Sequence, residues 1–316
     1  MITFERVSKK YGPVEALKEV SFRIPPGGIT GLLGRNAAGK STALNLMTGY
    51  FSPTSGTVMI GEKNMALEPA TCKRMIGYLP EKPPLYDEMT VEEYLRFVCE
   101  LREVLPRAIS AHVAEIMTLC AVTDMRARIL GHLSRGYRQR VGIAQALCGS
   151  PDILILDEPT AGLDPGQTAE IRRLIRLLGR DRTVVFSSHI LSEVQQLCDR
   201  AIILKEGRFI RMVHLSEGAE EQQDVFRLRL VAAGPLSRLQ PALQAIPCVL
   251  STENISQISS QPDTQSATMI LLCRRKDESG LAEDQIFRAC AALNMPIRHL
   301  SEEAETLESI FLHETE

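Results

Sequence analysis

The sequence lacks the long apolar run that a membrane-spanning helix needs. None of its 316 residues lies in a stretch of 18 consecutive apolar residues, whereas a transmembrane helix takes about 20. The amino terminus also lacks the apolar core of a signal peptide, because Glu5 stands where that core would lie. We therefore expect a chain that neither spans a membrane nor is secreted.

An excess of basic residues is also missing. The chain has 36 Lys and Arg against 39 Asp and Glu, a formal net charge of -3 and a pI near 6.1. Proteins that bind nucleic acid as their main partner usually present a broad basic surface. Nucleic acid is therefore not expected as the main partner, although a local basic patch remains open.

Closely spaced cysteines are the third absence. The eight cysteines are widely scattered, with no CxxC pair and no histidine nearby at the spacing of a metal site. We interpret them as small core residues of a protein in a reducing cytosol. They are Cys72, Cys99, Cys120, Cys148, Cys198, Cys248, Cys273 and Cys290.

The length and composition indicate a globular protein of two units. A typical domain has roughly 100 to 200 residues, and this chain has 316. With 44% hydrophobic and 24% charged residues it can form a core and shows no sign of general disorder.

Residues 1–215 alternate short β-type runs with helical patterns, which is typical of an α/β domain with a mostly parallel sheet. The runs are continuously apolar, as expected for strands buried on both faces. The predicted strands are Gly28 to Leu33, Ile153 to Leu156, Thr183 to Ser187 and Ala201 to Leu204.

Between Pro83 and Ala146 the pattern contains helices only, which predicts a helical insert within the α/β domain. Thr90 and Glu93 have the spacing of a capping box and predict a helix start. A second helix is predicted by apolar residues at spacings of three and four. These are Ile109, Val113, Ile116, Met117 and Cys120.

The polar, acidic segment EGAEEQQD, at residues 217–224, predicts a linker over 216–224. Beyond it, strands are predicted at Val225 to Leu230 and Thr268 to Cys273, and a helix at Ala282 to Leu293. Residues 225–316 are therefore expected to form a small accessory α+β domain. The sequence shows no catalytic constellation there, and both a regulatory role and a dimer-stabilising role stay open.

The segment GRNAAGKST fits the P-loop pattern G-x-x-x-x-G-K-[ST] and lies between a predicted strand and a helical run, as a P-loop must. Its backbone N–H groups and the positive end of the helix dipole would surround the phosphates of ATP. Lys40 would reach the β- and γ-phosphates, Ser41 would bind Mg²⁺, and Thr42 would contact the α-phosphate. The loop comprises Gly34, Arg35, Asn36, Ala37, Ala38, Gly39, Lys40, Ser41 and Thr42.

A second motif ends the strand at Ile153, where four apolar residues precede two carboxylates, as in a Walker B motif. Because side chains alternate along a strand, Asp157 and Glu158 are expected to point differently. Asp157 would help to hold Mg²⁺, and Glu158 would face the attacking water.

Further motifs, in a fixed order across residues 1–215, resemble those of ATP-binding subunits of ABC transporters. Tyr11 in KKYG resembles the aromatic that stacks on adenine, and Glu81 in IGYLPEKPP stands at the Q-loop position. The run LSRGYRQR, from Leu133 to Arg140, resembles the signature motif. Asp164 ends the equivalent of the D-loop, and His189 resembles the switch histidine.

The resemblance implies a P-loop NTPase fold and a head-to-tail dimer, formed by identical or different ATPase subunits. Ser134 and Gly136 of one subunit would then complete the γ-phosphate site of the other. Glu158 would polarise water and His189 would steady the γ-phosphate. It also implies separate integral membrane subunits that hold the chain at the inner face of the cell membrane.

The sequence departs from the family pattern at several positions. Ala37 replaces the usual glycine, and at a positive φ its methyl group would cost roughly 1 to 2 kcal/mol. Arg35 stands where proline is common, and the signature has Arg135 and Tyr137 in LSRGY instead of LSGGQ. Glu81 replaces glutamine and adds a negative charge beside the triphosphate, although it can also coordinate Mg²⁺.

These variants resemble the branch of bacterial ABC-2 type export ATPases that includes gliding-motility and multidrug-like subunits. The ending LESIFLHET, at residues 307–315, resembles the ending of those ATPases. An ATPase that powers an exporter is therefore the leading hypothesis. A non-transport ABC ATPase acting on ribosomes or nucleic acid is the alternative, against which stand the single cassette, the absence of heptads and the absence of a basic excess.

Overall fold

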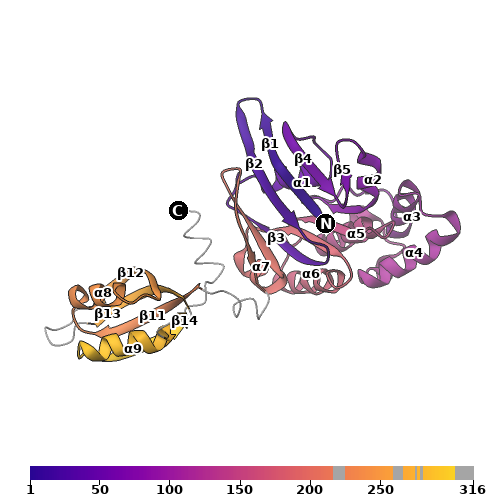
Figure 1. Cartoon of the computed structure of the whole chain (residues 1–316). Coiled ribbons are helices and arrows are strands. Elements are labelled where there is room, and N and C mark those ends of the chain that lie inside the picture. The colour runs from indigo at the N-terminus through magenta and orange to yellow at the C-terminus, as the bar shows by residue number, and fades with distance from the viewer. Residues whose placement is uncertain (216–224, 259–265, 275, 278–279, 303–316) are drawn as a thin grey trace. The chain divides into compact units, whose positions relative to one another are not determined.

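The computed structural model describes residues 1–215, 225–258, 266–274, 276–277 and 280–302. These residues divide into two compact units, one within residues 1–215 and one within 225–302 (Figure 1). The predicted linker at 216–224 and the ending LESIFLHET lie outside the described residues.

The first unit is built on a six-stranded sheet with the order β10-β9-β3-β8-β7-β6. All neighbouring strands are parallel except β10, which pairs antiparallel with β9. The four predicted strands are confirmed, two of them with unchanged bounds. The strands are β3 (Gly28–Leu33), β6 (Ile76–Leu79), β7 (Ile153–Asp157), β8 (Thr183–Ser187), β9 (Arg200–Lys205) and β10 (Arg208–His214).

A second, antiparallel sheet of order β2-β1-β4-β5 was not foreseen from the sequence. Its first hairpin is irregular, with register shifts along the pairing and positive φ at Arg6 and Glu19. These irregularities interrupt the period-two alternation by which a strand is recognised. The strands are β1 (Ile2–Tyr11), β2 (Val14–Ile24), β4 (Ser55–Ile60) and β5 (Lys63–Asn64).

Helix α1 (Lys40–Met47) packs in one hydrophobic core with residues of both sheets. Its Leu44 and Met47 share that core with Phe4 of β1 and Ile155 of β7, and all four are almost fully buried. This packing fixes the P-loop, which leads directly into α1. The remaining helices outside the insert are α2 (Pro69–Arg74), α6 (Pro165–Leu178) and α7 (Leu191–Leu197).

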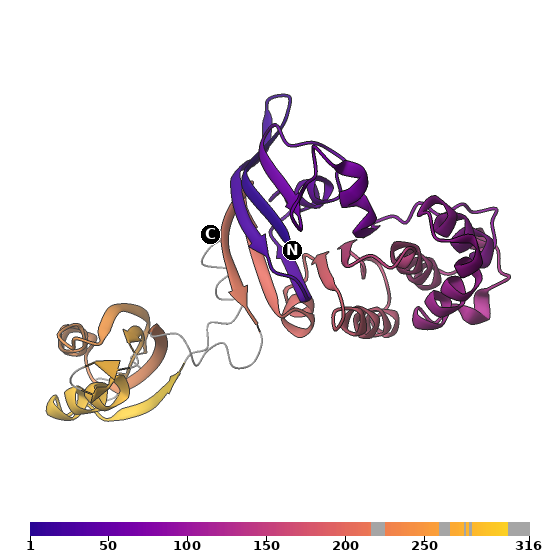
Figure 2. The ribbon, with the colours of Figure 1, turned by 45° about the vertical axis from the view of Figure 1, so that its right-hand side comes forward.

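The helical insert contains α3 (Val91–Leu101), α4 (Pro106–Leu119) and α5 (Arg135–Leu147), which lie together at one end of this unit (Figure 2). The predicted capping box is confirmed, because Thr90 accepts from the Glu93 backbone N–H and Glu93 accepts from that of Thr90. The predicted apolar stripe of α4 is buried. Two short 3-10 helices precede α5, at Thr123–Met125 and Leu130–His132.

Apart from the two-stranded sheet β14-β15, which lies between β13 and α9 in the sequence, the second unit has the element order β-α-β-β-α-β and a sheet of order β12-β13-β11-β16. This arrangement is of the ferredoxin-like type. All its pairings are antiparallel. The predicted strands and helix are confirmed, with β11 and β13 each longer than expected. The elements are β11 (Val225–Ala233), α8 (Leu236–Gln244), β12 (Val249–Ile258), β13 (Ser266–Arg274), β14 (Lys276–Asp277), β15 (Gly280–Leu281), α9 (Ala282–Ala292) and β16 (Ile297–Glu302).

Within the described residues, no helix is both long and apolar enough to cross a membrane. All eight cysteine side chains are buried, as expected of core residues.

Candidate functional site

The P-loop follows β3 and ends where α1 begins, in the predicted strand–loop–helix order. Gly39, at the N-cap, has φ 103°, and no side chain caps the first N–H groups of α1. A Cβ on Gly39 would approach Leu17 Cδ2 to 2.7 Å, and one on Gly34 would approach the Leu204 carbonyl oxygen to 2.7 Å. The loop is therefore tightly packed against Leu17 and Leu204. The first backbone N–H groups of α1 stay available as hydrogen-bond donors for an anion.

Ala37 has a φ of 66°, so the backbone takes the left-handed conformation at this position. The positive φ at which a methyl group was expected to be costly is therefore present. Alanine in place of glycine destabilises this backbone conformation by roughly 1 to 2 kcal/mol.

Lys40 is the buried cation of the loop, with only 8% of its surface exposed. Its Nζ donates to the carbonyl oxygens of Gly34, at 2.6 Å, and Arg35, at 3.3 Å. Burial lowers the pKa of Lys40, and the nearby carboxylates of Glu158 and Asp157 oppose that shift. When a nucleoside triphosphate binds, its phosphate oxygens could replace these two carbonyl oxygens as acceptors for the Lys40 ammonium group.

A pocket of about 580 Å³ collects most of the predicted nucleotide-binding residues. Tyr11 lies at its edge, 40% exposed, with its ring edge-on to that of Phe51 at 5.7 Å. Lys9 Nζ also lies over this ring, 5.1 Å from its centroid. A partly exposed aromatic ring at the edge of a pocket can stack on a base. The predicted residues that line the pocket are Tyr11, Arg35, Asn36, Ala37, Ala38, Gly39, Lys40, Ser41, Thr42, Glu81 and Glu158.

Asp157 and Glu158 have different side-chain partners, Ser187 and His189, but the strand alternation predicted from the sequence does not extend to Glu158. Strand β7 ends at Asp157, and Glu158 already has the left-handed φ of 47°. Ser187, at the end of β8, holds both residues: its Oγ donates to Asp157 Oδ1 at 2.6 Å and accepts from the Glu158 N–H at 2.9 Å. Sequence reasoning missed Ser187, whose only signal is its place at the end of the neighbouring strand.

Both carboxylates have raised pKa values. Burial is the main cause for Asp157, reinforced by the charge of Glu81 and opposed by the Ser187 hydrogen bond. Burial also raises the pKa of Glu158, while His189 and Lys40 favour its charged form. A carboxylate that is partly desolvated in this way is a stronger base than one in water.

His189 meets Glu158 at the edge of this site. Its Nδ1 lies 2.9 Å from Oε2 of Glu158, and its side chain is 58% exposed. The imidazole can therefore reach both the carboxylate and a group in solvent beside it.

The signature residues lie elsewhere on the same unit. Ser134 and Gly136 line a separate pocket of about 530 Å³, which shares no lining residue with the P-loop pocket. Ser134 caps α5, its Oγ accepting from the Tyr137 N–H at 3.4 Å, and Asp164 caps α6 through the Gln167 N–H at 2.9 Å. The structure therefore does not bring Ser134, Gly136 or Asp164 into the pocket of their own P-loop.

The two signature substitutions have partners within the chain. The Arg135 guanidinium lies against the Cα of Gly162, where a Cβ would overlap it. Tyr137 Oη donates to Asp124 Oδ2 at 2.9 Å, and the ring faces Arg140 at 5.8 Å. Both substituted side chains thus pack on the surface that carries Ser134.

Comparison with known proteins agrees with this geometry. Residues 17–161 match the ABC transporter family model. The ABC transporter ATP-binding protein NatA of Bacillus subtilis is 35% identical, covering 73% of this chain and 98% of that protein. The bacitracin transport ATP-binding protein BcrA of Bacillus licheniformis is 37% identical, covering 66% of this chain and 67% of that protein.

Among solved structures, the dimeric ATP-binding cassette MJ0796, in a post-hydrolysis state with ADP and phosphate, matches with a TM-score of 0.63. It is 27% identical and covers 68% of this chain and 99% of its own. The α/β P-loop fold and the resemblance drawn from the motifs are confirmed. The chain therefore belongs to the family of ABC transporter ATP-binding proteins, the subunits that bind and hydrolyse ATP.

Proposed function

We propose that this chain works as a dimer in which each ATP lies between the P-loop of one subunit and the signature motif of the other. The observation that carries the proposal is the separation of two half-sites within one chain. Lys40 and Glu158 line one pocket, and Ser134 and Gly136 line another. A second copy, facing the first head to tail, joins unlike halves and makes two equivalent sites.

Mg²⁺ is the metal that this donor set fits. Ser41 and Glu81 line the P-loop pocket, and Asp157 is close enough to Glu81 for that charge to raise its pKa. Hydroxyl and carboxylate oxygens are the ligands that Mg²⁺ prefers. The ion, when bound, would neutralise charge on the phosphates, and Ser41, Asp157 and Glu81 would hold it.

The chain's own groups supply the hydrolytic chemistry. Lys40 stabilises the charge of the β- and γ-phosphates, and the carboxylate of Glu158 accepts a proton from the attacking water. Glu158 suits this role because burial raises its pKa. His189, hydrogen-bonded to Glu158, orients that carboxylate and contacts the γ-phosphate. Tyr11 stacks on the adenine.

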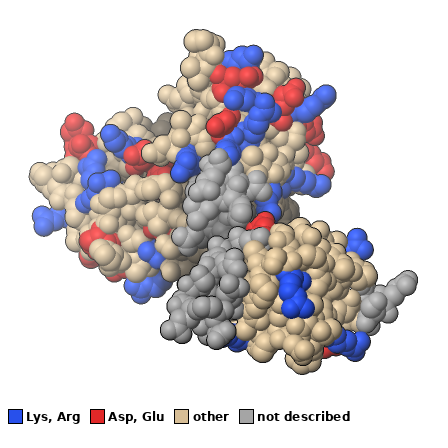
Figure 3. All heavy atoms as spheres, turned by 90° about the vertical axis from the view of Figure 1, so that its left-hand side faces the viewer, with Lys and Arg blue, Asp and Glu red and all other residues tan. Residues whose placement is uncertain are grey.

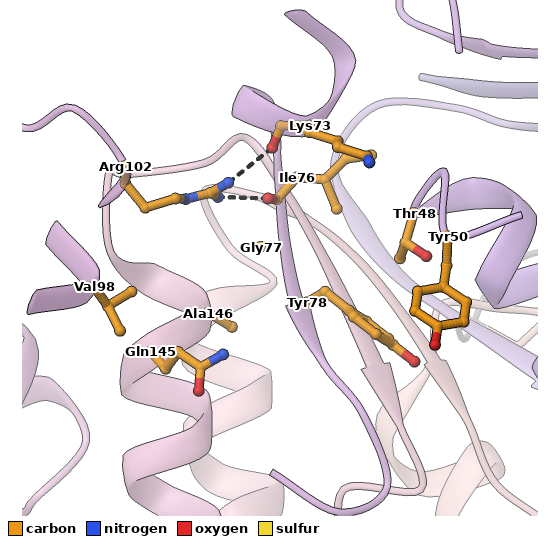
Figure 4. A pocket seen from close by; sticks show the side chains of 10 residues that line it. All are labelled: Thr48, Tyr50, Lys73, Ile76, Gly77, Tyr78, Val98, Arg102, Gln145 and Ala146. Carbon is orange, nitrogen blue, oxygen red and sulfur yellow. Dashed lines mark hydrogen bonds between the residues drawn. The ribbon is translucent and has the colours of Figure 1, made fainter. Parts of the chain in front are cut away.

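A groove between β6, the segment after α1 and the helical insert is the surface proposed for the membrane subunit (Figure 4). It has a volume of about 300 Å³, with Thr48 and the 71% exposed Tyr50 on one side and Val98 of α3 on the other. Arg102, on the same side as Val98, links the insert to the segment before β6 and to β6 itself by donating to the carbonyl oxygens of Lys73, at 2.9 Å, and Ile76, at 2.5 Å.

This groove lies along β6, and the chain continues from β6 to Glu81 within two residues. A movement at the nucleotide pocket would therefore reach the groove, and a membrane subunit bound there, through a short segment. We propose that ATP-driven closure of the dimer moves the membrane subunit by this route, with the chain held at the inner face of the membrane.

Export is the proposed direction of transport. The LPE and LSRGYRQR variants resemble ABC-2 type export ATPases, and one relative is named for bacitracin transport. Action on ribosomes or nucleic acid is not favoured, because the chain has no excess of basic residues, with 36 Lys and Arg against 39 Asp and Glu. On the one face shown in Figure 3, acidic and basic side chains are interspersed. Isolation from membranes with an integral membrane protein supports transport, and recovery with ribosomes contradicts it.

Two variants test the hydrolytic assignment. Lys40→Ala should lose both nucleotide binding and turnover, because the buried cation that meets the phosphates is gone. Glu158→Gln should keep nucleotide binding but lose turnover by about 100-fold or more, because the amide cannot accept the proton. Equal turnover in the wild type and both variants would contradict the assignment.

A further inference from the structure

A buried carboxylate outside the nucleotide pocket lies close to the catalytic pair. Glu193 of α7 is only 3% exposed. Its Oε2 accepts two hydrogen bonds, from Thr160 Oγ1 at 2.9 Å and from Ser188 Oγ at 3.0 Å. Its Oε1 lies 3.8 Å from Nε of Arg172. A buried carboxylate is tolerated only with partners of this kind, and removing them is expensive.

The two hydroxyl partners of Glu193 belong to the two segments that carry the catalytic residues. Thr160 follows Glu158 by two residues, and Ser188 directly precedes His189. The side chains of Glu158 and His189 lie 2.9 Å apart. One carboxylate therefore ties together the backbone segments on which that distance depends.

The segment after β7 needs such a restraint. Glu158 has a φ of 47°, a conformation that strains a residue with a side chain and persists only when the surroundings enforce it. Ser187 restrains this segment from one side through the Glu158 N–H. The Glu193 carboxylate restrains it from the other, through Thr160.

Glu193 does not line the nucleotide pocket, and neither do Thr160 and Ser188. Its effect must therefore pass through the positions of Glu158 and His189 and not through contact with ATP. A misplacement of about 1 Å at a reacting group can lower a rate by on the order of 100-fold.

We propose that Glu193 is a positioning residue for hydrolysis, whose carboxylate holds the Glu158 and His189 segments in register through Thr160 and Ser188. The inference rests on the proposed roles of Glu158 and His189. It assigns a function to a carboxylate that the hydrolytic chemistry itself leaves unused. Because the P-loop is untouched, the loss of this tie should lower kcat and leave KM for ATP nearly unchanged.

Matched pairs of variants in the full chain test this role. Thr160→Val replaces the hydroxyl with a methyl group, whereas Thr160→Ser keeps the hydroxyl and removes the methyl group. Glu193→Leu removes the acceptor, whereas Glu193→Gln keeps one carbonyl oxygen for the two hydroxyls. Steady-state ATP hydrolysis gives kcat and KM, and thermal unfolding reports whether each variant is folded.

We expect Thr160→Val and Glu193→Leu to lose about 10-fold or more in kcat with KM within about twofold of wild type. Thr160→Ser and Glu193→Gln should stay within about threefold of the wild-type kcat, because their hydrogen bonds survive. If Glu193→Leu fails to fold, the Thr160 pair still decides the matter.

Three results would overturn the inference. One is wild-type kcat in Thr160→Val, another is an equal loss in Thr160→Val and Thr160→Ser, and the third is a rise in KM at unchanged kcat. Lys40→Ala separates this failure from that of the hydrolytic assignment. Wild-type turnover equal to that of Lys40→Ala overturns both, whereas a difference between them with no effect of Thr160→Val overturns the role of Glu193 alone.

Discussion

The two half-sites of the ATPase unit are similar in size and differ in chemistry. The P-loop pocket has about 580 Å³ and the signature pocket about 530 Å³, and each lies at the start of a helix. The first contains Lys40, Glu81 and Glu158. The second contains Ser134 and the ion pair of Arg140 with Glu170. In the proposed dimer, the reactive groups would thus all come from one half, and the other half would supply the surface against which they close.

The helix ends show the same difference. No side chain caps α1, so its first N–H groups are available to phosphate. Ser134 already caps α5 through the Tyr137 N–H, in a long hydrogen bond of 3.4 Å. The Ser134 Oγ accepts in this hydrogen bond, so its own O–H can still donate to a phosphate oxygen of ATP held by a partner subunit.

The largest expected effect comes from mixing two inactive variants, one in each half-site. Lys40→Ala removes the reactive half, and Ser134→Arg obstructs the other. In a heterodimer of the two, the wild-type P-loop of one chain faces the wild-type signature of the other, which restores one site of two. An equal mixture that exchanges freely should recover about a quarter of the wild-type rate, against almost none for either variant alone.

The rate of ATP hydrolysis after co-expression measures this recovery. Activity no higher than the mean of the two single variants would show that the half-sites do not combine across subunits. A mixture of Lys40→Ala with Glu158→Gln serves as the control and should not recover, because both changes fall in the same half-site.

A smaller effect is expected within the P-loop itself, where two neighbouring alanines differ in backbone conformation. Ala37 has a φ of 66°, whereas Ala38 is not among the residues with positive φ. Ala37→Gly relieves strain, and Ala38→Gly only adds freedom to the unfolded chain and removes a buried methyl group. The free energy of unfolding should therefore differ between the two variants by roughly 1 to 2 kcal/mol, in favour of Ala37→Gly.

Chemical denaturation of each variant measures this difference, and nucleotide titration accompanies it. Binding by Ala37→Gly should be at least as strong as in the wild type. A large loss of nucleotide affinity in Ala37→Gly would show that the strained backbone is needed for binding.

The smallest effect concerns the pH dependence of stability. It should arise from the buried carboxylates beside the P-loop, Asp157 and Glu158, whose pKa values are raised. Burial raises the pKa of Asp157 above its ordinary value of 3.8. The folded protein therefore holds the proton of the Asp157 carboxyl more tightly than the unfolded chain does. The wild type loses stability as the pH rises from the pKa of Asp157 in the unfolded chain to its higher pKa in the folded protein. Asp157→Asn removes the penalty, and its stability relative to wild type should increase from about pH 4 to pH 7.

Thermal unfolding without nucleotide or Mg²⁺, at a series of pH values, measures this change. Glu158→Gln should behave in the same direction, because burial also raises the pKa of Glu158. A relative stability of Asp157→Asn that decreases with pH would mean that other groups favour the charged form of Asp157.

The sequence predicted the elements whose signals are local. The buried strands at Gly28 and Thr183 are continuous apolar runs, and the capping box at Thr90 needs only a spacing of three residues. The antiparallel sheet was missed, because a positive φ at Arg6 and Glu19 disturbs its alternation. The ferredoxin-like order of the second unit also could not be predicted, since strand order depends on pairings between distant segments.

The sequence by itself determined that this chain has a P-loop, a Walker B pair and the ordered motifs of an ABC ATPase, because each motif is a contiguous run read at fixed spacing. Only the tertiary structure decided how these groups stand: Ala37 and Glu158 at positive φ, Ser134 apart from the pocket of its own P-loop, and Glu193 between Thr160 and Ser188. Backbone strain and contacts between distant segments arise from packing through space, which no local pattern of residues records.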